Sequence, residues 1–321
     1  MTRSRWGILA TGNIAGSMAA ALRHVPGAEL LAVASRYQSS ADRFAATWSV
    51  PRAYPSHAAL LADPDVDIVY VATPNTLHKQ NVLDALAAGK HVLCEKPLTT
   101  SVEDTLECVE AARAAGLFLM EAMWTAFFPA MQKARELVAS GAIGTPRHLT
   151  AQFVSYRDPA KHPNLFDPAL GGGATLDLGI YPITVAQLLA GSIATCSAEV
   201  VTGASGVDEM VVVAARHEND VVSQLSFGFC TEMPASVHLT GDNGTLAIPQ
   251  DFYRPDQIVL TRGGKVETLN LPYLGNGYTH EAQHVQECLL GGQSESDDFP
   301  LNLSIGSARL LAEIGSNSAN A

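Results

Sequence analysis

Lys96, Asp177 and Tyr181 are the residues of this 321-residue chain whose types and spacing best suit chemistry. Lys96 follows an apolar run, residues 91–94, that is typical of a buried parallel strand. Pro97 lacks an N–H and restricts Lys96 to an extended conformation, so the lysine is expected at the carboxyl edge of a sheet. Asp177 and Tyr181 stand four residues apart and share one face if that segment is helical.

A carboxylate beside a phenol makes a reasonable acid–base pair, especially near Lys96, because an adjacent cation lowers the pKa of a tyrosine. Each residue also has a structural interpretation: a solvated lysine ending a strand, a capping aspartate, and a half-buried core tyrosine. Three glycines, residues 171–173, precede the pair. They let a backbone pass close to a ligand, and we expect that ligand to be the nicotinamide end of a cofactor.

Residues 10–16 read Ala-Thr-Gly-Asn-Ile-Ala-Gly between a strand-like run, residues 5–9, and a helical pattern. This is a degenerate form of the G-x-G-x-x-G/A loop of dinucleotide-binding domains, with Ala10 and Ala15 at the first and third glycine positions. The physical requirement is that a pyrophosphate can approach the backbone at a helix N-terminus, and Gly12 meets it.

Ser35 and Arg36 follow a second expected strand, residues 29–34, where NAD-preferring sites carry an acid. A hydroxyl and a guanidinium suit a 2′-phosphate, and the missing carboxylate removes a repulsion, so NADP(H) is predicted over NAD(H). The predicted cofactor-binding residues are Thr11, Gly12, Asn13, Ile14, Ser35, Arg36, Thr73, Pro74, Asn75, His78, Glu95 and Lys96. For His78, a cofactor contact and a solvent-facing place in the first turn of a helix are equally open.

The order of strands and helices predicts two domains. Early in the chain they alternate, which predicts an α/β Rossmann-type N-terminal domain with a doubly wound sheet. The later part reads as strands with period-two patterning and hairpin signals, with helices expected at residues 281–290 and 303–315. It predicts an α+β C-terminal domain with a large, mainly antiparallel sheet. We assign NADP binding to residues 1–122, and substrate binding and dimerisation to residues 123–321.

The composition favours a cytoplasmic enzyme. A net charge of −12 disfavours nucleic acid and anionic membranes as partners. No apolar run approaches transmembrane length, and the N-terminus leads directly into a strand rather than a signal peptide. The five cysteines have no metal-type spacing, which indicates free thiols in a reducing compartment and predicts no metal site.

Candidate substrate contacts are Trp124, Phe153, Arg157 and His280, which suit a sugar ring or a cyclic diol. Hydrophobic core and solvated loop positions are the alternative for these residues. Residues 280–284 read His-Glu-Ala-Gln-His, a literal H-E-x-x-H motif. If His280, Glu281 and His284 formed a zinc site, the protein would be a zinc hydrolase, but five-residue matches arise by chance and no third ligand is obvious nearby.

The loop at residues 10–15, the Glu95-Lys96-Pro97 stop and the Gly-Gly-Gly…Asp177…Tyr181 block together resemble the Gfo/Idh/MocA family, named for glucose–fructose oxidoreductase and inositol dehydrogenase. The resemblance covers essentially the whole chain. Residues 121–124 and 127–129 match the branch that contains dimeric dihydrodiol dehydrogenase and D-xylose dehydrogenase. It implies that Lys96 and Tyr181 are the catalytic pair, with Asp177 beside them, and that a sugar or cyclic diol is oxidised or its ketone reduced.

Two positions depart from the family pattern. Ala10 replaces the usual first glycine, and Ala126 stands where the branch often has arginine, which puts in doubt any substrate contact made by that arginine. A non-catalytic dinucleotide-binding sensor is the alternative to an enzyme, and the retention of Lys96 and Tyr181 argues against it. An open sheet needs its outer face covered, so a homodimer is expected, as the resemblance also implies.

Overall fold

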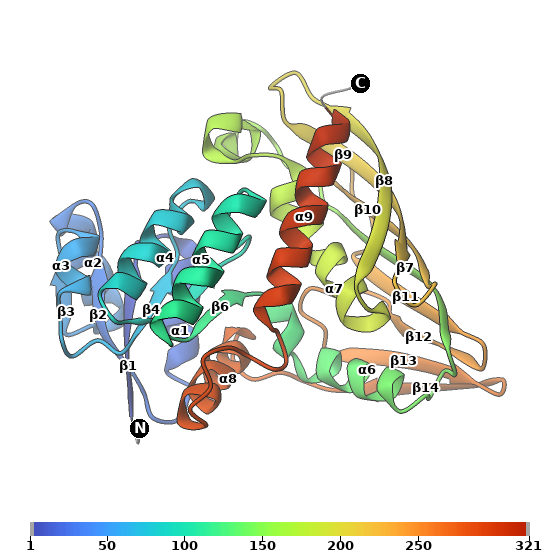
Figure 1. Ribbon diagram of the computed structural model, residues 1–321, viewed down its shortest axis with the longest axis horizontal. Coiled ribbons are helices and arrows are strands. Elements are labelled where there is room, and N and C mark those ends of the chain that lie inside the picture. The colour runs from blue at the N-terminus through green and yellow to red at the C-terminus, as the bar shows by residue number, and fades with distance from the viewer. Residues whose placement is uncertain (1–2, 319–321) are drawn as a thin grey trace. The chain divides into compact units, whose positions relative to one another are not determined.

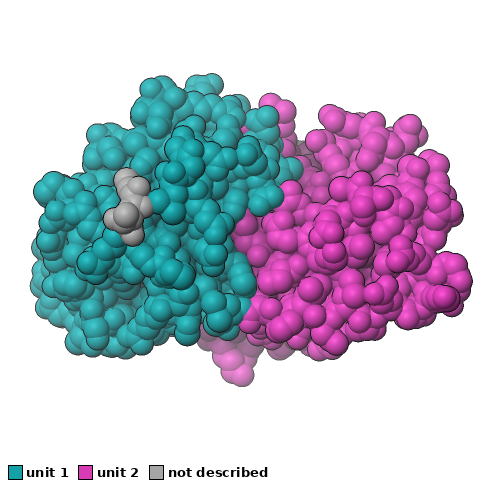
Figure 2. Space-filling model, turned by 90° about the horizontal axis from the view of Figure 1, so that it is seen from below, with its two compact units in different colours: residues 1–124, 274–304 teal, residues 125–273, 305–321 magenta. Residues whose placement is uncertain are grey.

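The chain folds into two compact units, and the computed structural model describes residues 3–318. The first unit comprises residues 1–124 and 274–304, and the second comprises residues 125–273 and 305–321 (Figure 2). The predicted boundary at residue 122 lies close to the first crossing between the units. The structure differs from the prediction for residues 274–304, which were assigned to the second domain and which return to the first unit.

The first unit is built on a six-stranded parallel sheet with the order β3-β2-β1-β4-β5-β6 (Figure 1). The strands are β1 (Ser4–Leu9), β2 (Ala28–Ala34), β3 (Arg52–Tyr54), β4 (Ile68–Val71), β5 (His91–Glu95) and β6 (Leu119–Ala122). The helices between them are α1 (Asn13–Leu22), α2 (Gln38–Trp48), α3 (His57–Leu61), η1 (Asn75–Leu77), α4 (His78–Ala87) and α5 (Val102–Ala115). The predicted doubly wound domain is confirmed. Its strand order reverses between β1 and β4, which is where such sheets bind ligands at the carboxyl ends of their strands.

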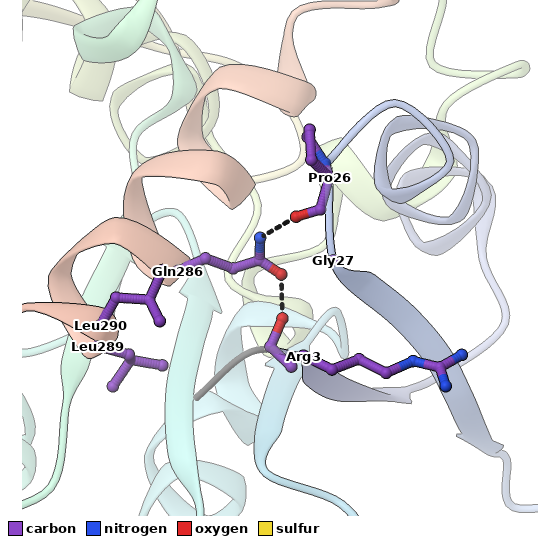
Figure 3. Close-up of a pocket in the computed structure, with 7 residues that line it drawn as sticks. Arg3, Pro26, Gly27, Gln286, Leu289 and Leu290 are labelled. Atoms are coloured by element: carbon purple, nitrogen blue, oxygen red, sulfur yellow. Dashed lines mark hydrogen bonds between the residues drawn. The ribbon is translucent and has the colours of Figure 1, made fainter.

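Helix α8 (Tyr278–Leu290) completes the first unit from a distant part of the chain. Gln286 of α8 accepts a hydrogen bond from the Ser4 hydroxyl of β1 and donates one of 3.0 Å to the Pro26 carbonyl. Figure 3 shows its side chain pointing between these partners in a small pocket that Leu289 and Leu290 also line. The bonded residues are 282 and 260 positions apart, so local sequence patterns do not reveal the contact.

The second unit is built on an eight-stranded sheet with the order β14-β13-β12-β11-β7-β10-β9-β8 (Figure 1). The strands are β7 (Pro146–Val154), β8 (Ile193–Thr202), β9 (Asp208–His217), β10 (Val222–Gly228), β11 (Ser236–Gly241), β12 (Gly244–Ile248), β13 (Gln257–Arg262) and β14 (Lys265–Asn270). Strands β10 and β7 pair in parallel and the other neighbours pair antiparallel. The predicted large, mainly antiparallel sheet is confirmed.

The helical elements of the second unit are α6 (Pro129–Ala139), η3 (Pro163–Phe166), η4 (Pro168–Leu170), the π-helical turn η5 (Thr175–Gly179) and α7 (Ile180–Ala190). Two elements pass from one unit to the other, η2 (Trp124–Phe127) and α9 (Leu301–Ser318). The observed α8 and α9 both begin two or three residues before the predicted helices.

Helix α7 packs against β7 and β10 and is buried on all sides, which explains why it is apolar all round. Within residues 3–318, the stretch Pro168–Ala190 is long and apolar enough to cross a membrane by length and composition alone. Because 83% of that window is buried inside the protein, it has the character of a core helix. On the opposite face of the sheet, alternate side chains such as Val212 and Val222 are exposed.

Candidate active site

The N-terminus of α1 is open to an anion. Gly12 is the N-cap residue, its backbone is extended, and it has no side chain to satisfy the first N–H groups of the helix. The first turn is uncharged, so the positive end of the helix dipole is not neutralised there. Thr11, Gly12 and Asn13 line a cavity of about 430 Å³ together with Trp48 and Asn276. These features fit the pyrophosphate of a dinucleotide.

Ala10 explains why glycine is usual at the first position of this loop. Its φ is +92°, in the region that glycine adopts freely and that a residue with a Cβ rarely takes. Its N–H donates to the Ala34 carbonyl at 2.9 Å, which holds the loop on the end of β2. The structure shows the turn formed with the backbone of Ala10 in that strained conformation.

The predicted cofactor-binding residues gather at the carboxyl ends of the strands of the first unit. They follow β1 (Thr11, Gly12, Asn13, Ile14), β2 (Ser35, Arg36) and β4 (Thr73, Pro74, Asn75, His78), or lie at the end of β5 (Glu95, Lys96). Parallel strands end at one edge, so the topology places all of these positions at the same edge. The Arg36 side chain is exposed beside the nearly buried Ser35.

His78 is fully buried, so the expectation of a solvent-facing histidine is wrong. Its Nδ1 lies 2.8 Å from the Pro97 carbonyl oxygen and its Nε2 lies 2.9 Å from the Thr73 carbonyl oxygen. Burial lowers the pKa of His78, and the two carbonyl oxygens oppose that effect. With both ring nitrogens engaged by backbone, His78 joins the loop after β4 to the segment that carries Lys96.

Lys96 lies beside two acids, the half-buried Glu95 and the buried Glu121. Glu95 accepts hydrogen bonds from the Tyr70 hydroxyl and, at 3.1 Å, from the Lys96 backbone N–H. Glu121 is 2% exposed and accepts the Leu98 N–H at 2.9 Å. Burial raises the pKa of Glu95 and of Glu121, and the Lys96 cation lowers both. The charge of Lys96 therefore stabilises the ionised forms of both carboxyls.

Glu281 is another buried acid of this unit. It is 0% exposed, and its two carboxyl oxygens have no hydrogen-bond partner within the described part of the chain. Burial raises the pKa of Glu281 well above its usual value, and the nearby Glu95 raises it further. Burial therefore favours the neutral form of this carboxyl, at a cost to stability.

Glu281→Met is expected to stabilise the protein increasingly as pH rises. The folded state keeps the Glu281 proton over a range in which the unfolded chain releases it, so stability falls as pH rises from the ordinary glutamate pKa to the raised one. Methionine buries no unsatisfied polar group, so the free energy of unfolding should rise by about 1–3 kcal/mol at about pH 8 and by less at about pH 4. Urea denaturation across this range measures the effect. Glu287→Gln, at an exposed position of α8, should show no such trend.

The second unit places Tyr181 in an aromatic cluster. Tyr181 is 8% exposed and lies near the start of α7, directly after η5, which carries Asp177. Its ring meets Phe153 edge-on at 5.4 Å and Tyr253 edge-on at 6.2 Å between centroids. Phe153 and Tyr253 stack on each other at 4.6 Å. Both packing rings fix the orientation of the Tyr181 side chain.

A cavity of about 400 Å³ opens beside this cluster in the second unit. It is lined by Phe153 and Tyr253 and by polar residues, among them Ser155, Glu232, Gln250 and Asp251. Arg157 donates to the Ser155 hydroxyl at 2.8 Å, next to this lining. The structure thus brings the predicted Phe153, Arg157 and Tyr181 into one neighbourhood. Tyr253 was missed by sequence reasoning because a single aromatic residue in a loop gives no local signal.

The remaining predicted residues, Trp124 and His280, belong to the first unit. Trp124 stacks on Tyr278 with ring centroids 4.4 Å apart. His280 Nε2 accepts the Leu274 N–H at 3.0 Å, and His284 Nε2 lies 2.7 Å from the Ser296 hydroxyl. Within residues 3–318, no group of three histidine, cysteine or acidic side chains is arranged to hold a metal ion. The zinc hydrolase hypothesis therefore has no ligand set in this arrangement.

Comparisons with known proteins match both parts of the chain. Residues 4–123 match the family model described as Gfo/Idh/MocA, an oxidoreductase family with an NAD-binding Rossmann fold. Residues 131–247 match the model of the Gfo/Idh/MocA C-terminal domain. The chain is 36% identical over 322 residues to trans-1,2-dihydrobenzene-1,2-diol dehydrogenase of Mus musculus, in an alignment that covers 97% of this chain and 94% of the relative.

Solved structures show the same architecture. A 3-ketoreductase from Actinomadura kijaniata, in complex with TDP-benzene and NADP, superposes with a TM-score of 0.84 at 28% identity, covering 98% of each chain. An oxidoreductase from Agrobacterium radiobacter, in complex with NAD+, L-tartaric acid and magnesium, superposes with a TM-score of 0.88 over 99% of this chain and 97% of that one. At 22% identity, the second likeness shows the fold alone.

Proposed function

The chain belongs to the Gfo/Idh/MocA oxidoreductase family, and from this premise we propose that it transfers hydride between NADP(H) and the carbinol or carbonyl carbon of a neutral sugar or cyclic diol. Family membership makes it an NAD(P)-binding oxidoreductase. The proposal adds the preference for NADP(H), the substrate class and the residues that act. It assigns cofactor binding to the first unit and substrate binding to the second.

The observation that carries the proposal is the position of Lys96 at the carboxyl end of β5, where its charge acts on Glu95 and Glu121. Strand β5 neighbours β4 and therefore stands close to the switch point of the sheet, where dinucleotides bind in such folds. A cation held at that edge suits a reaction in which negative charge develops on a substrate oxygen.

The proposed roles divide proton handling among three side chains. When bound, the dinucleotide supplies the hydride donor or acceptor. Tyr181 takes the substrate hydroxyl proton during oxidation and returns it during reduction. Lys96 favours the phenolate form of Tyr181 and stabilises the alkoxide, and Asp177 orients the substrate or the lysine.

The cavity beside Tyr253 supports a neutral, hydroxyl-rich substrate. Glu232, Gln250 and Asp251 line it and offer oxygen acceptors to hydroxyl groups. A phosphate or carboxylate on the substrate would meet the charge of Glu232 there, while the charge of Asp251 is paired with Arg254 at 3.2 Å. The stacked rings of Phe153 and Tyr253 give a flat apolar surface for the C–H face of a ring. The relative from Mus musculus is named for a neutral cyclic diol.

A substrate screen tests the proposed function directly. Purified protein is assayed with NADP+ and neutral sugars or cyclic diols, and with NADPH and the corresponding ketones, while NADPH absorbance is followed. We expect turnover with at least one neutral polyol and none with its phosphorylated counterpart. A sensor would bind NADPH in a fluorescence titration and show no turnover in either arm, which would contradict the proposal.

Arg36→Ala is expected to weaken NADP(H) binding by about 1.5–3 kcal/mol, the range for a charge-assisted hydrogen bond, because the guanidinium is proposed to pair with the 2′-phosphate. NAD(H) lacks that phosphate, so its affinity should hardly change. Fluorescence titration of both nucleotides measures the difference. Arg43→Ala removes another exposed cation from the same unit and should leave the NADP(H)/NAD(H) ratio unchanged. Equal affinity of the unmodified protein for both nucleotides would overturn the assignment.

We also propose a cytoplasmic homodimer formed through the exposed face of the eight-stranded sheet. Val212 and Val222 are each 46% exposed there, and Ala214 and Gln224 face each other across β9 and β10. A flat face of short, mostly uncharged side chains suits pairing with a second copy. All five cysteines are free thiols, which fits a reducing compartment. Light scattering at micromolar concentration should show a dimer that Val212→Glu disrupts, and a monomer would contradict the proposal.

A further inference from the structure

Asp208 holds the start of the turn that carries Asp177. Its Oδ2 accepts a hydrogen bond from the Thr175 N–H at 2.6 Å and another from the Thr175 hydroxyl at 2.7 Å. Asp208 is the first residue of β9, and Thr175 is the first residue of η5. The N-cap of η5, Ala174, has no side-chain cap of its own. The carboxylate therefore caps this turn from a neighbouring strand.

The glycines before η5 make room for this contact. A Cβ on Gly173, whose φ is +115°, would lie 2.2 Å from Asp208 Oδ1, and a Cβ on Gly172 would lie 2.6 Å from the Leu165 carbonyl oxygen. The sequence predicts that the glycine run approaches the cofactor. Within the second unit, Gly173 approaches Asp208 and Gly172 approaches the backbone of Leu165.

Burial raises the pKa of Asp208, and hydrogen bonds from Thr175 lower it. A carboxylate at the N-terminal end of a helical segment is also favoured by the segment's dipole. Downstream, Gly179 passes so close to the Phe227 ring that a Cβ would come within 2.7 Å of it. The turn from Thr175 to Gly179 is π-helical rather than α-helical. Its winding is therefore set by the contacts at its two ends, with Asp208 and with Phe227, and not by helix propensity.

We propose that Asp208 is a positioning residue for the oxidoreductase reaction: it fixes the turn from Thr175 to Gly179 and thereby the placement of Asp177 and Tyr181. This inference rests on the proposed function, because it assumes that Tyr181 moves the substrate proton. Asp208 acts through η5 and need not touch the substrate. A displacement of the turn by about 1 Å would be enough to lower turnover strongly.

The test is a double-mutant cycle with Asp208→Ala and Tyr181→Phe. Asp208→Ala alone should lower kcat by about 10–100-fold, the effect of a small misplacement of a reacting group. In the Tyr181→Phe background it should cost less than about threefold more, because the residual reaction no longer depends on where the phenol lies. NADPH affinity should be unchanged in all variants, because the proposed cofactor residues belong to the first unit.

Controls separate positioning from stability. Asp208→Asn keeps an oxygen acceptor for Thr175 and should retain kcat within about threefold of the unmodified enzyme. Glu218→Ala, at an exposed position just after β9, should change nothing. If Asp208→Ala does not fold, Thr175→Val removes one of the two hydrogen-bond donors to Asp208, keeps a branched side chain and should lower kcat without changing NADPH affinity.

If Asp208→Ala lowered kcat equally in the unmodified and the Tyr181→Phe enzymes, the inference would be overturned. A loss of kcat that only follows a lower melting temperature would also overturn it. If Asp208→Ala had a normal kcat while Tyr181→Phe had a lowered kcat, the inference would also be overturned, but the proposed function would stand. Normal kcat in Tyr181→Phe would instead remove the proposed role of the phenol, and with it the basis of the inference.

Discussion

Tyr181→Phe is expected to lower turnover by about 10²–10⁴-fold, the usual loss when a general acid–base group is removed. The substitution deletes one hydroxyl and keeps the ring that packs on Phe153 and Tyr253 at 5.4 and 6.2 Å. The fold and the affinity for NADP(H) should therefore stay close to those of the unmodified protein. Steady-state kcat on the substrate found in the screen, with NADPH titrated by fluorescence, measures both quantities.

Tyr253→Phe is the matched control, because it deletes a hydroxyl from the same aromatic cluster without touching the proposed proton carrier. Its turnover should remain within about tenfold of the unmodified enzyme, well inside the loss expected for an acid–base group. If Tyr181→Phe kept near-normal turnover, the phenol would not be the proton-transfer group. His280, whose pKa is lowered by burial, or a bound water would then be the next candidate.

The architecture was predictable because its signals are local. Most parallel strands of the first unit end where an apolar run meets a polar or small residue, as at Glu95 and Lys96 at the end of β5. The alternating exposure of β9 and β10 likewise follows from period-two patterning. The return of α8 to the first unit was not predictable, because it depends on contacts such as that between Gln286 and Ser4, 282 positions apart.

Sequence alone singles out a candidate residue when its type and spacing suggest chemistry. It does not single out a residue whose role depends on a contact that forms only in the folded protein. Lys96, Asp177 and Tyr181 stand out by type and spacing. Asp208 does not, because its role arises from a bond to Thr175 across 33 positions. Glu281 was noticed as part of an H-E-x-x-H motif, yet its burial without a partner is visible only in three dimensions. The four-residue spacing of Asp177 and Tyr181 suggested an α-helical face, whereas the structure winds Asp177 into a π-helical turn.

Lys96→Ala is expected to reduce turnover by at least as much as Tyr181→Phe, about 10²–10⁴-fold or more, because it removes the charge that both activates the phenol and stabilises the alkoxide. The residual activity should require a higher pH, since without the cation the phenol holds its proton more tightly. The variant should still fold. Loss of Lys96 lets the pKa of Glu95 and of Glu121 rise further, which favours their neutral forms over uncompensated charges.

The pH dependence of kcat/KM distinguishes this role from simple loss of structure. Lys96→Arg keeps a positive charge and should preserve the pH profile even if the larger head group lowers turnover. Lys79→Ala removes a surface lysine of the same unit, which is bound to Asp104 at 2.6 Å and to Glu107 at 2.8 Å. It should alter neither the turnover nor the pH profile. If Lys96→Ala lost activity with an unchanged pH profile, the lysine would serve binding alone. The proton chemistry would then have to be set by Tyr181 and Asp177 without it.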